Sequence, residues 1–183
     1  MDEADLILTS LGASHLESWA EGLATDIANE HLFGIGHSMD IILAENHPAP
    51  AALVRSHITS ERVGIAQAQV LRSCIEPTPE QVAEFGPLTV QVQDHWSLPL
   101  DGAALVRPEL VASVPGFDLS PDFATELTRK LYTYNAINAV VSYIGHQRGY
   151  EMLAEAANDS DITGWVQFAA VGSGNRLVFG AGF

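Results

Sequence analysis

Two short, almost continuous apolar runs near the start of the chain predict strands that are buried on both faces. The first lies within residues 4–11 and ends at Gly12, and the second covers residues 39–44. Apolar runs of this length that end at glycine or at polar residues are typical of strands in a parallel sheet. The first part of the chain is therefore expected to contain such a sheet.

Helices are expected between and after these strands. Ser14 and Glu17 have the spacing of a capping box, and apolar residues then recur at helical spacing as far as Ile27. A glycine-rich loop is expected at residues 33–36, and a helix with proline in its first turn at residues 50–57. Strands that alternate with helices predict right-handed crossovers and a parallel sheet.

The pattern changes after residue 64. Residues 64–75 alternate weakly between apolar and polar positions and residues 88–93 alternate clearly, so we expect a strand in each segment. These strands are expected to add an antiparallel extension at the edge of the parallel sheet. Residues 98–115 contain proline, glycine and an Asp-Gly pair, which predicts a hairpin and a connecting loop.

The last third of the chain is expected to be helical. Ser120 is the predicted N-cap of a long helix, because proline and aspartate follow it. This helix is expected to run to about residue 144, before Gly145. Further helices are expected at residues 150–158 and 165–171.

Charge and composition exclude some kinds of partner. The chain has 183 residues and a formal net charge of −15, from 23 acidic and 8 basic residues. Such a charge repels nucleic acids and anionic membranes. The acidic N-terminus and the lack of an apolar run of roughly 20 residues argue against a signal peptide and a membrane span. A single cysteine, Cys74, agrees with a reducing compartment, so a cytoplasmic protein is expected.

Sequence motifs for metals and nucleotides give little support to either kind of site. The seven histidines contain no pair four residues apart and no His-Glu-x-x-His motif, so no metal site is expected. A Gly-x-Gly-x-x-Gly dinucleotide fingerprint is also missing, since Gly34 and Gly36 come before a predicted strand and not after one.

Lys130 is the single lysine of the chain, whose other seven basic residues are arginines. A buried lysine loses its proton more readily, whereas arginine stays charged, so lysine can act as a base. On an uninterrupted helix Lys130, Tyr134 and Asn138 would lie within an arc of about 80°, with Asn135 roughly 60° further round. The two amides suit stabilisation of a developing alkoxide. The alternative is that these are ordinary polar residues on a solvated helix.

Three further candidate residues follow the predicted strands. Gly12 comes after the first strand, and Glu45 and Asn46 come after the second. The carboxyl ends of parallel strands are the edge at which ligands bind. A plain turn at Gly12 and an Asx turn at Asn46 explain these residues equally well.

Several of these segments together resemble the long-chain polyol dehydrogenases, most closely their mannitol-1-phosphate 5-dehydrogenase branch. The helix motif is Lys130-x4-Asn135-x2-Asn138, and the segments 42–46 and 114–117 also resemble the family. The resemblance implies an α/β fold made of the second half of a Rossmann-like parallel sheet with an antiparallel extension, followed by the start of an α-helical domain. It implies a partial dinucleotide-binding domain at residues 1–117 and the beginning of a helical substrate domain at residues 118–183. The chain would cover only the middle of the family, as a truncated form.

The activity implied by the resemblance is the NAD-dependent oxidation of a sugar alcohol or its phosphate, without a metal. Lys130 would be the general base, and Asn46 and Asn135 would form an oxyanion hole. Asn138 stands where the family has histidine, and is a fourth candidate in the catalytic site. Gly12, Glu45 and Asn46 would bind the NAD cofactor, and a polyol or polyol phosphate would be the substrate.

A second hypothesis is a non-catalytic remnant that acts as a binding or interaction module. Asn138 cannot shuttle a proton as histidine does, and Leu71 stands where the family has aspartate. In a half-sheet one strand edge would stay unpaired, which favours self-association or binding of a partner chain through that edge.

Overall fold

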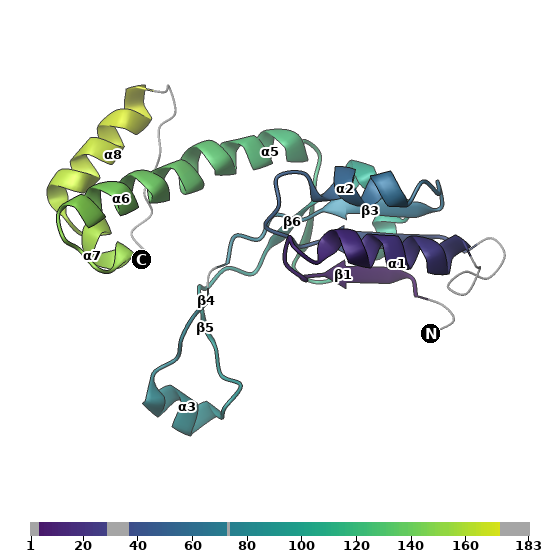
Figure 1. Cartoon of the computed structure of the whole chain (residues 1–183), viewed down its shortest axis with the longest axis horizontal. Coiled ribbons are helices and arrows are strands. Elements are labelled where there is room, and N and C mark those ends of the chain that lie inside the picture. Colours follow the sequence, from purple (N-terminus) through teal and green to yellow (C-terminus); the bar gives the residue numbers. More distant parts are fainter. Residues whose placement is uncertain (1–3, 29–36, 73, 173–183) are drawn as a thin grey trace. The chain divides into compact units, whose positions relative to one another are not determined.

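A computed structural model describes residues 4–28, 37–72 and 74–172, with side chains as far as residue 166. The chain divides into two compact units, Met1–Phe123 and Ala124–Phe183, which we describe separately. The loop expected at residues 33–36 lies outside the described residues. The fold is α/β, with parallel strands that alternate with helices in the first unit and helices in the second (Figure 1). None of the helices in the described part of the chain is long and apolar enough to cross a membrane.

The first unit is built on a parallel sheet of strand order β1-β2-β3, as predicted. Its strands and helices are β1 (Leu6–Thr9), α1 (Leu16–Ala28), β2 (Met39–Leu43), α2 (Pro50–His57) and β3 (Val63–Gln67). Both apolar runs form strands, β1 and β2, and the helix predicted at residues 50–57 is α2, with the predicted bounds.

The prediction of Ser14 as the N-cap of α1 is wrong. The helix begins at Leu16, and the first helical hydrogen bond runs from the amide of Trp19 to the carbonyl of His15 at 3.1 Å. His15 is therefore the capping position. The sequence suggested Ser14 because serine is a far better cap than histidine, but Leu16 is completely buried and its packing decides where the helix starts.

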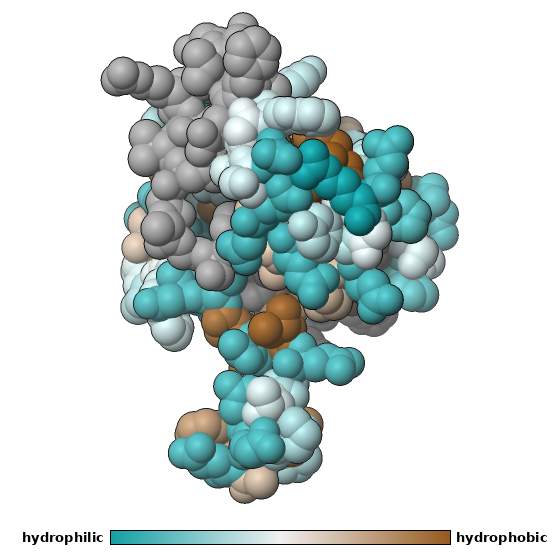
Figure 2. Space-filling model, turned by 90° about the vertical axis from the view of Figure 1, so that its left-hand side faces the viewer, coloured by the Kyte–Doolittle hydropathy of each residue, from teal (hydrophilic) through white to brown (hydrophobic). Residues whose placement is uncertain are grey.

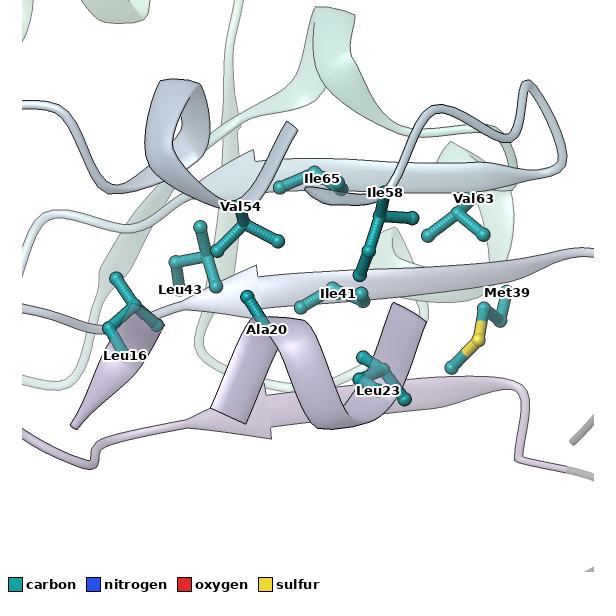
Figure 3. Close-up of a cluster of buried hydrophobic side chains, with 10 residues drawn as sticks. All are labelled: Leu16, Ala20, Leu23, Met39, Ile41, Leu43, Val54, Ile58, Val63 and Ile65. Carbon is teal, nitrogen blue, oxygen red and sulfur yellow. The ribbon is translucent and has the colours of Figure 1, made fainter. Parts of the chain in front are cut away.

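Strand β2 is buried on both faces, which explains why four of its five residues are apolar. Its first, third and fifth residues pack on one face against α1 and α2, and Figure 3 shows the side chains of this core. They are Leu16, Ala20, Leu23, Met39, Ile41, Leu43, Val54, Ile58, Val63 and Ile65. Ile42 points to the other face, where it packs with Ala68, Leu100 and Val111. Each fully buried large aliphatic side chain contributes about 1.5–3 kcal/mol.

The strand predicted at residues 64–75 is in fact two strands. After β3 the chain leaves the parallel sheet, and the end of the predicted segment forms the two-residue strand β4 (Cys74–Ile75). It pairs antiparallel with β5 (Gln91–Val92), and α3 (Pro79–Phe85) lies between them. This antiparallel pair is a separate two-stranded sheet and not an extension of the parallel one. The Ala68 amide still donates to the Leu43 carbonyl of β2. Ala68 also forms an isolated antiparallel bridge with Leu100, and the Gln69 amide donates to the Pro99 carbonyl, so β3 ends where the chain begins to pair with residues 99–100.

The prediction of a hairpin and a connecting loop at residues 98–115 is also wrong. This part of the chain contains β6 (Leu98–Asp101), the short 3-10 helix η1 (Gly102–Ala104) and α4 (Pro108–Ala112). β6 pairs in parallel with β7 (Phe117–Ser120). A four-residue strand that contains proline carries almost no sequence signal, and it forms here because Leu100 is completely buried in the core beside Ile42.

The long helix begins and ends later than predicted. Ser120 ends β7, and α5 (Phe123–Lys130) begins three residues further on. A π-helical turn, η2 (Leu131–Asn135), follows, and α6 (Ala136–Gln147) extends past Gly145. Figure 1 shows α5 and α6 along one continuous helical ribbon. Gly145 does not end the helix. Glycine occupies this position because a Cβ atom there would overlap the Cβ of Ala156.

A small helical core completes the second unit. The two later helices predicted from the sequence are α7 (Leu153–Ala157) and α8 (Ser160–Gly172). The helix that contains Lys130 packs against them through α6. The buried hydrophobic residues of this core are Val141, Ala156, Ile162 and Val166.

Candidate functional site

The carboxyl ends of β1 and β2 lie at the same edge of the sheet, because these strands are parallel and Thr9 pairs with Leu43. The three residues predicted for cofactor binding, Gly12, Glu45 and Asn46, follow these strand ends. The structure therefore brings them to one edge, which is the ligand-binding edge of open parallel sheets.

Glu45 holds the turn between β1 and α1. Its carboxylate Oε1 accepts a hydrogen bond from the Leu11 amide at 2.8 Å, and Oε2 accepts one from the Gly12 amide at 2.9 Å. The side chain is buried, with 6% of the residue exposed. A carboxylate is stable in such a place only because both oxygens are hydrogen-bonded. Glu45 therefore holds the backbone of this edge in place, and its neighbour in sequence, Asn46, is exposed.

Gly12 leaves open space at this edge. Its φ is +85°, a conformation that favours glycine, and no atom lies within 4 Å of the position that a Cβ would take. Thr9, at the end of β1, is buried, and its hydroxyl oxygen has no hydrogen-bond partner among the residues that the structure describes. A ligand could therefore approach the backbone here and could satisfy a polar group.

The other candidate residues lie on the helix of the second unit. Lys130 is the last residue of α5 and is half-buried. Burial lowers the pKa of its amine below the usual value for lysine. Asn135 ends η2, Asn138 lies in the first turn of α6, and both are exposed. A partly desolvated amine and two accessible amides therefore share one helical segment.

Asn46 belongs to the first unit, and Lys130 and Asn135 belong to the second. A catalytic site that contains all three thus stays a prediction from the resemblance.

A groove in the first unit was not predicted from the sequence. It has a volume of about 280 Å³, and its lining includes Leu71, Arg72, His95, Trp96 and Phe117. The Arg72 guanidinium lies 4.6 Å from the centroid of the Trp96 ring, and its Nε donates to the His95 carbonyl at 2.8 Å. The Nε2 atom of His95 is buried, and no hydrogen-bond partner for it lies in the described part of the chain. The sequence analysis singled out Leu71 of this lining, but only as a difference from the family.

A second group of residues was also missed because it comes from two helices. Glu17 and Glu21 of α1 lie beside His57 of α2, with possible ligand atoms all within 4.8 Å of one another. Two carboxylates and an imidazole are a donor set that can hold a divalent cation. The pair Glu17 and Glu21 is visible in the sequence, but its approach to His57 depends on the packing of α1 on α2.

Comparison with known proteins agrees with the resemblance found in the sequence. The chain is similar to a protein of Bacillus subtilis (strain 168) named mannitol-1-phosphate 5-dehydrogenase. The two are 30% identical over 196 aligned positions, which cover 100% of this chain and 49% of that protein. The chain resembles a polyol dehydrogenase over its whole length. It spans about half the length of this curated relative. No protein-family model matches the chain.

Proposed function

We propose that the chain takes part in the NAD-dependent oxidation of a polyol or polyol phosphate, with Lys130 as the general base. The observation that carries this proposal is the half-buried amine of Lys130 on a helix that also presents Asn135 and Asn138. The similarity to mannitol-1-phosphate 5-dehydrogenase supports the choice of reaction.

Lys130 removes the proton of the hydroxyl group that is oxidised. The amine must be neutral to accept this proton, and burial favours the neutral form because it lowers the lysine pKa. The Nζ atom gains the proton as the carbon–oxygen bond becomes a carbonyl. An arginine at this position would stay protonated and could not act in this way.

In the second unit, Asn135 donates a hydrogen bond from its amide group to the oxygen that loses the proton. The same role for Asn46, in the first unit, rests on the resemblance alone. A neutral amide stabilises the developing negative charge without binding an anion in the ground state. Asn138 binds a neighbouring hydroxyl group of the polyol, since an amide can both donate and accept hydrogen bonds.

The edge formed by Gly12, Glu45 and Asn46 fits the nicotinamide end of NAD. Gly12 leaves open space at the backbone, and the Thr9 hydroxyl is a buried group in need of a partner. The Glu45 carboxylate would repel a pyrophosphate but not a nicotinamide ring. When bound, NAD supplies the acceptor for the hydride that leaves the polyol carbon.

Two measurements test this function. Calorimetric titration with NADH tests cofactor binding, and a turnover assay with mannitol or mannitol 1-phosphate and NAD tests the reaction. Lys130→Ala and Lys130→Arg are each expected to lower kcat by roughly 100- to 10,000-fold. The adjacent Arg129→Ala, at an exposed position, is the control and should keep its activity. Turnover that Lys130→Ala leaves undiminished would disprove the role of Lys130.

The second candidate function, a binding or self-association module, is favoured by exposed apolar residues in the first unit. Within the described residues β1 pairs only with β2, so its other edge is open, and Leu8 of β1 is 54% exposed. Phe85, at the end of α3, and Leu88, between α3 and β5, are 69% and 92% exposed. Apolar side chains also reach the surface of the segment formed by β4, α3 and β5, at the lower end of Figure 2. Light scattering after size-exclusion chromatography tests this function, since a monomer at all concentrations would contradict self-association.

A further inference from the structure

The helix that carries Lys130 contains one widened turn. Residues Leu131–Asn135 form the π-helical turn η2, and the Ala136 amide donates to the carbonyl of Leu131, five residues earlier. An ordinary α-helix has this bond four residues back. The turn therefore contains one extra residue, a feature frequently found at functional sites.

The extra residue changes which side chains share a face. In an uninterrupted α-helix Asn135 would lie about 140° around the axis from Lys130, and Asn138 about 80°. Because one additional residue is taken up by the turn, both angles fall by about 100°. Asn135 then lies about 40° to one side of Lys130 and Asn138 about 20° to the other. The amine and the two amides thus form a narrow strip along the helix and not the broad face expected from the sequence.

Thr133 stands in the middle of this turn. It is buried, with 6% of the residue exposed, and its hydroxyl donates to the Arg129 carbonyl at 2.6 Å. A side-chain hydrogen bond to the carbonyl four residues earlier competes with the backbone bonds and distorts a helix. Leu131, Tyr132 and Tyr134 in the same turn are all exposed, so Thr133 is the buried anchor of η2.

We propose that Thr133 is a positioning residue that holds the widened turn and thereby keeps Lys130, Asn135 and Asn138 in one strip. Such a strip can contact successive hydroxyl groups of a single polyol. The inference rests on the proposed function for its catalytic consequence, but the geometry of the turn can be measured without any turnover.

The test compares Thr133→Val, which removes the hydroxyl, with Thr133→Ser, which keeps it. Because the chain has one lysine, isotope-labelled lysine gives a single set of side-chain signals in NMR spectra. We expect nuclear Overhauser contacts between the Lys130 side chain and the Asn135 amide in the wild type and in Thr133→Ser. They should be lost in Thr133→Val. In the turnover assay Thr133→Val should lower kcat by roughly 10- to 100-fold with KM changed by less than about twofold.

A deletion provides a second, independent test. Removing Tyr134, which is 61% exposed, takes out the extra residue and makes Asn135 the fourth residue after Lys130. The segment can then form an ordinary α-helix with the same strip. In this background Thr133→Val should have no further effect on the Lys130 to Asn135 contact, whereas an equal loss there would overturn the inference.

The outcomes separate this inference from the proposed function. A wild-type chain that shows the contact between Lys130 and Asn135 but oxidises no polyol would disprove the function, and the NMR comparison of the Thr133 variants would still decide the role of Thr133. A wild-type chain without that contact would overturn the inference. A Thr133→Val variant that keeps the Lys130 to Asn135 contact, with a kcat equal to that of the wild type, would also overturn the inference.

Discussion

Asp40 of β2 and Gly64 of β3 are register partners in the parallel sheet, and the Asp40 carboxylate occupies the space that a side chain at Gly64 would need. Asp40 is completely buried. Its two carboxylate oxygens accept hydrogen bonds from the amides of Val106 and Arg107, at 2.8 and 3.0 Å. The pair therefore fixes the segment that follows η1 onto the central strand of the sheet.

Gly64→Ala is expected to lower the free energy of unfolding by about 1–3 kcal/mol, as overpacking of a well-filled core does. The added Cβ would overlap the Asp40 carboxylate and lie 2.7 Å from the amide nitrogen of Val106. Urea denaturation followed by circular dichroism measures the change. Gly22→Ala in α1 is the control, because it meets no atom within 4 Å and should raise stability by about 1 kcal/mol. Equal stability of the two variants would contradict this account of the sheet.

Glu45→Gln is expected to destabilise the first unit by about 1–3 kcal/mol. Glutamine has one acceptor oxygen, so either the Leu11 or the Gly12 amide would face an NH₂ group. If this edge binds cofactor, the same variant should also weaken NADH binding in calorimetry. Glu76→Gln, at an exposed position, is the comparison and should leave both stability and binding unchanged.

Gly145→Ala is expected to destabilise the helical unit by about 1–3 kcal/mol, because the new methyl group would overlap the side chain of Ala156 in α7. Gly164→Ala in α8 is a matched helical substitution with no atom within 4 Å, and it should stabilise the helix. Thermal unfolding of both variants measures the difference. A Gly145→Ala variant as stable as Gly164→Ala would show that α6 and α7 pack less closely than the structure indicates.

Asp159 should make the helical unit sensitive to strong acid. Burial of the carboxyl acts to raise its pKa, but hydrogen bonds from the Arg148 side chain and the Ile162 and Asp161 amides outweigh this effect and lower the pKa to about 2. Since the folded-state pKa lies below the unfolded value of 3.8, this stabilisation is complete above pH 3.8 and is lost as the pH falls towards 2. When stability is measured during acid titration, Asp159→Asn should not show the loss of stability between pH 3.8 and 2 that protonation of the Asp159 carboxylate causes in the wild type. Identical stability curves for the variant and the wild type would refute this role of Asp159.

The Lys130 amine should titrate at a lower pH than an exposed lysine, because desolvation disfavours its charged form. In the labelled chain its NMR signal reports this titration directly, since no other lysine contributes. The rate of polyol oxidation should rise with pH as the same group loses its proton. A titration at the usual lysine pKa would contradict the burial of Lys130.

The sequence by itself determined the parallel sheet and which residues lie at the carboxyl edge of its first two strands. Strand β2 needed no tertiary information, because a strand covered on both faces is apolar at nearly every position. Its one charged residue, Asp40, is buried with both carboxylate oxygens hydrogen-bonded. The helix at Pro50–His57 was equally clear from proline at its start. Gly12 and Glu45 could be assigned to one edge because parallel strands end on the same side.

Only the tertiary structure decided the elements whose local signals are weak or contradictory. Leu98–Asp101 forms a strand because Leu100 fits the core beside Ile42, and Gly145 stays inside a helix because Ala156 packs against it. The π turn around Thr133 was also invisible, since an α-helix and a widened turn have the same apolar pattern over five residues. Local sequence fixes which side chains are apolar or polar, whereas the contacts made after packing decide where an element ends and which face it presents.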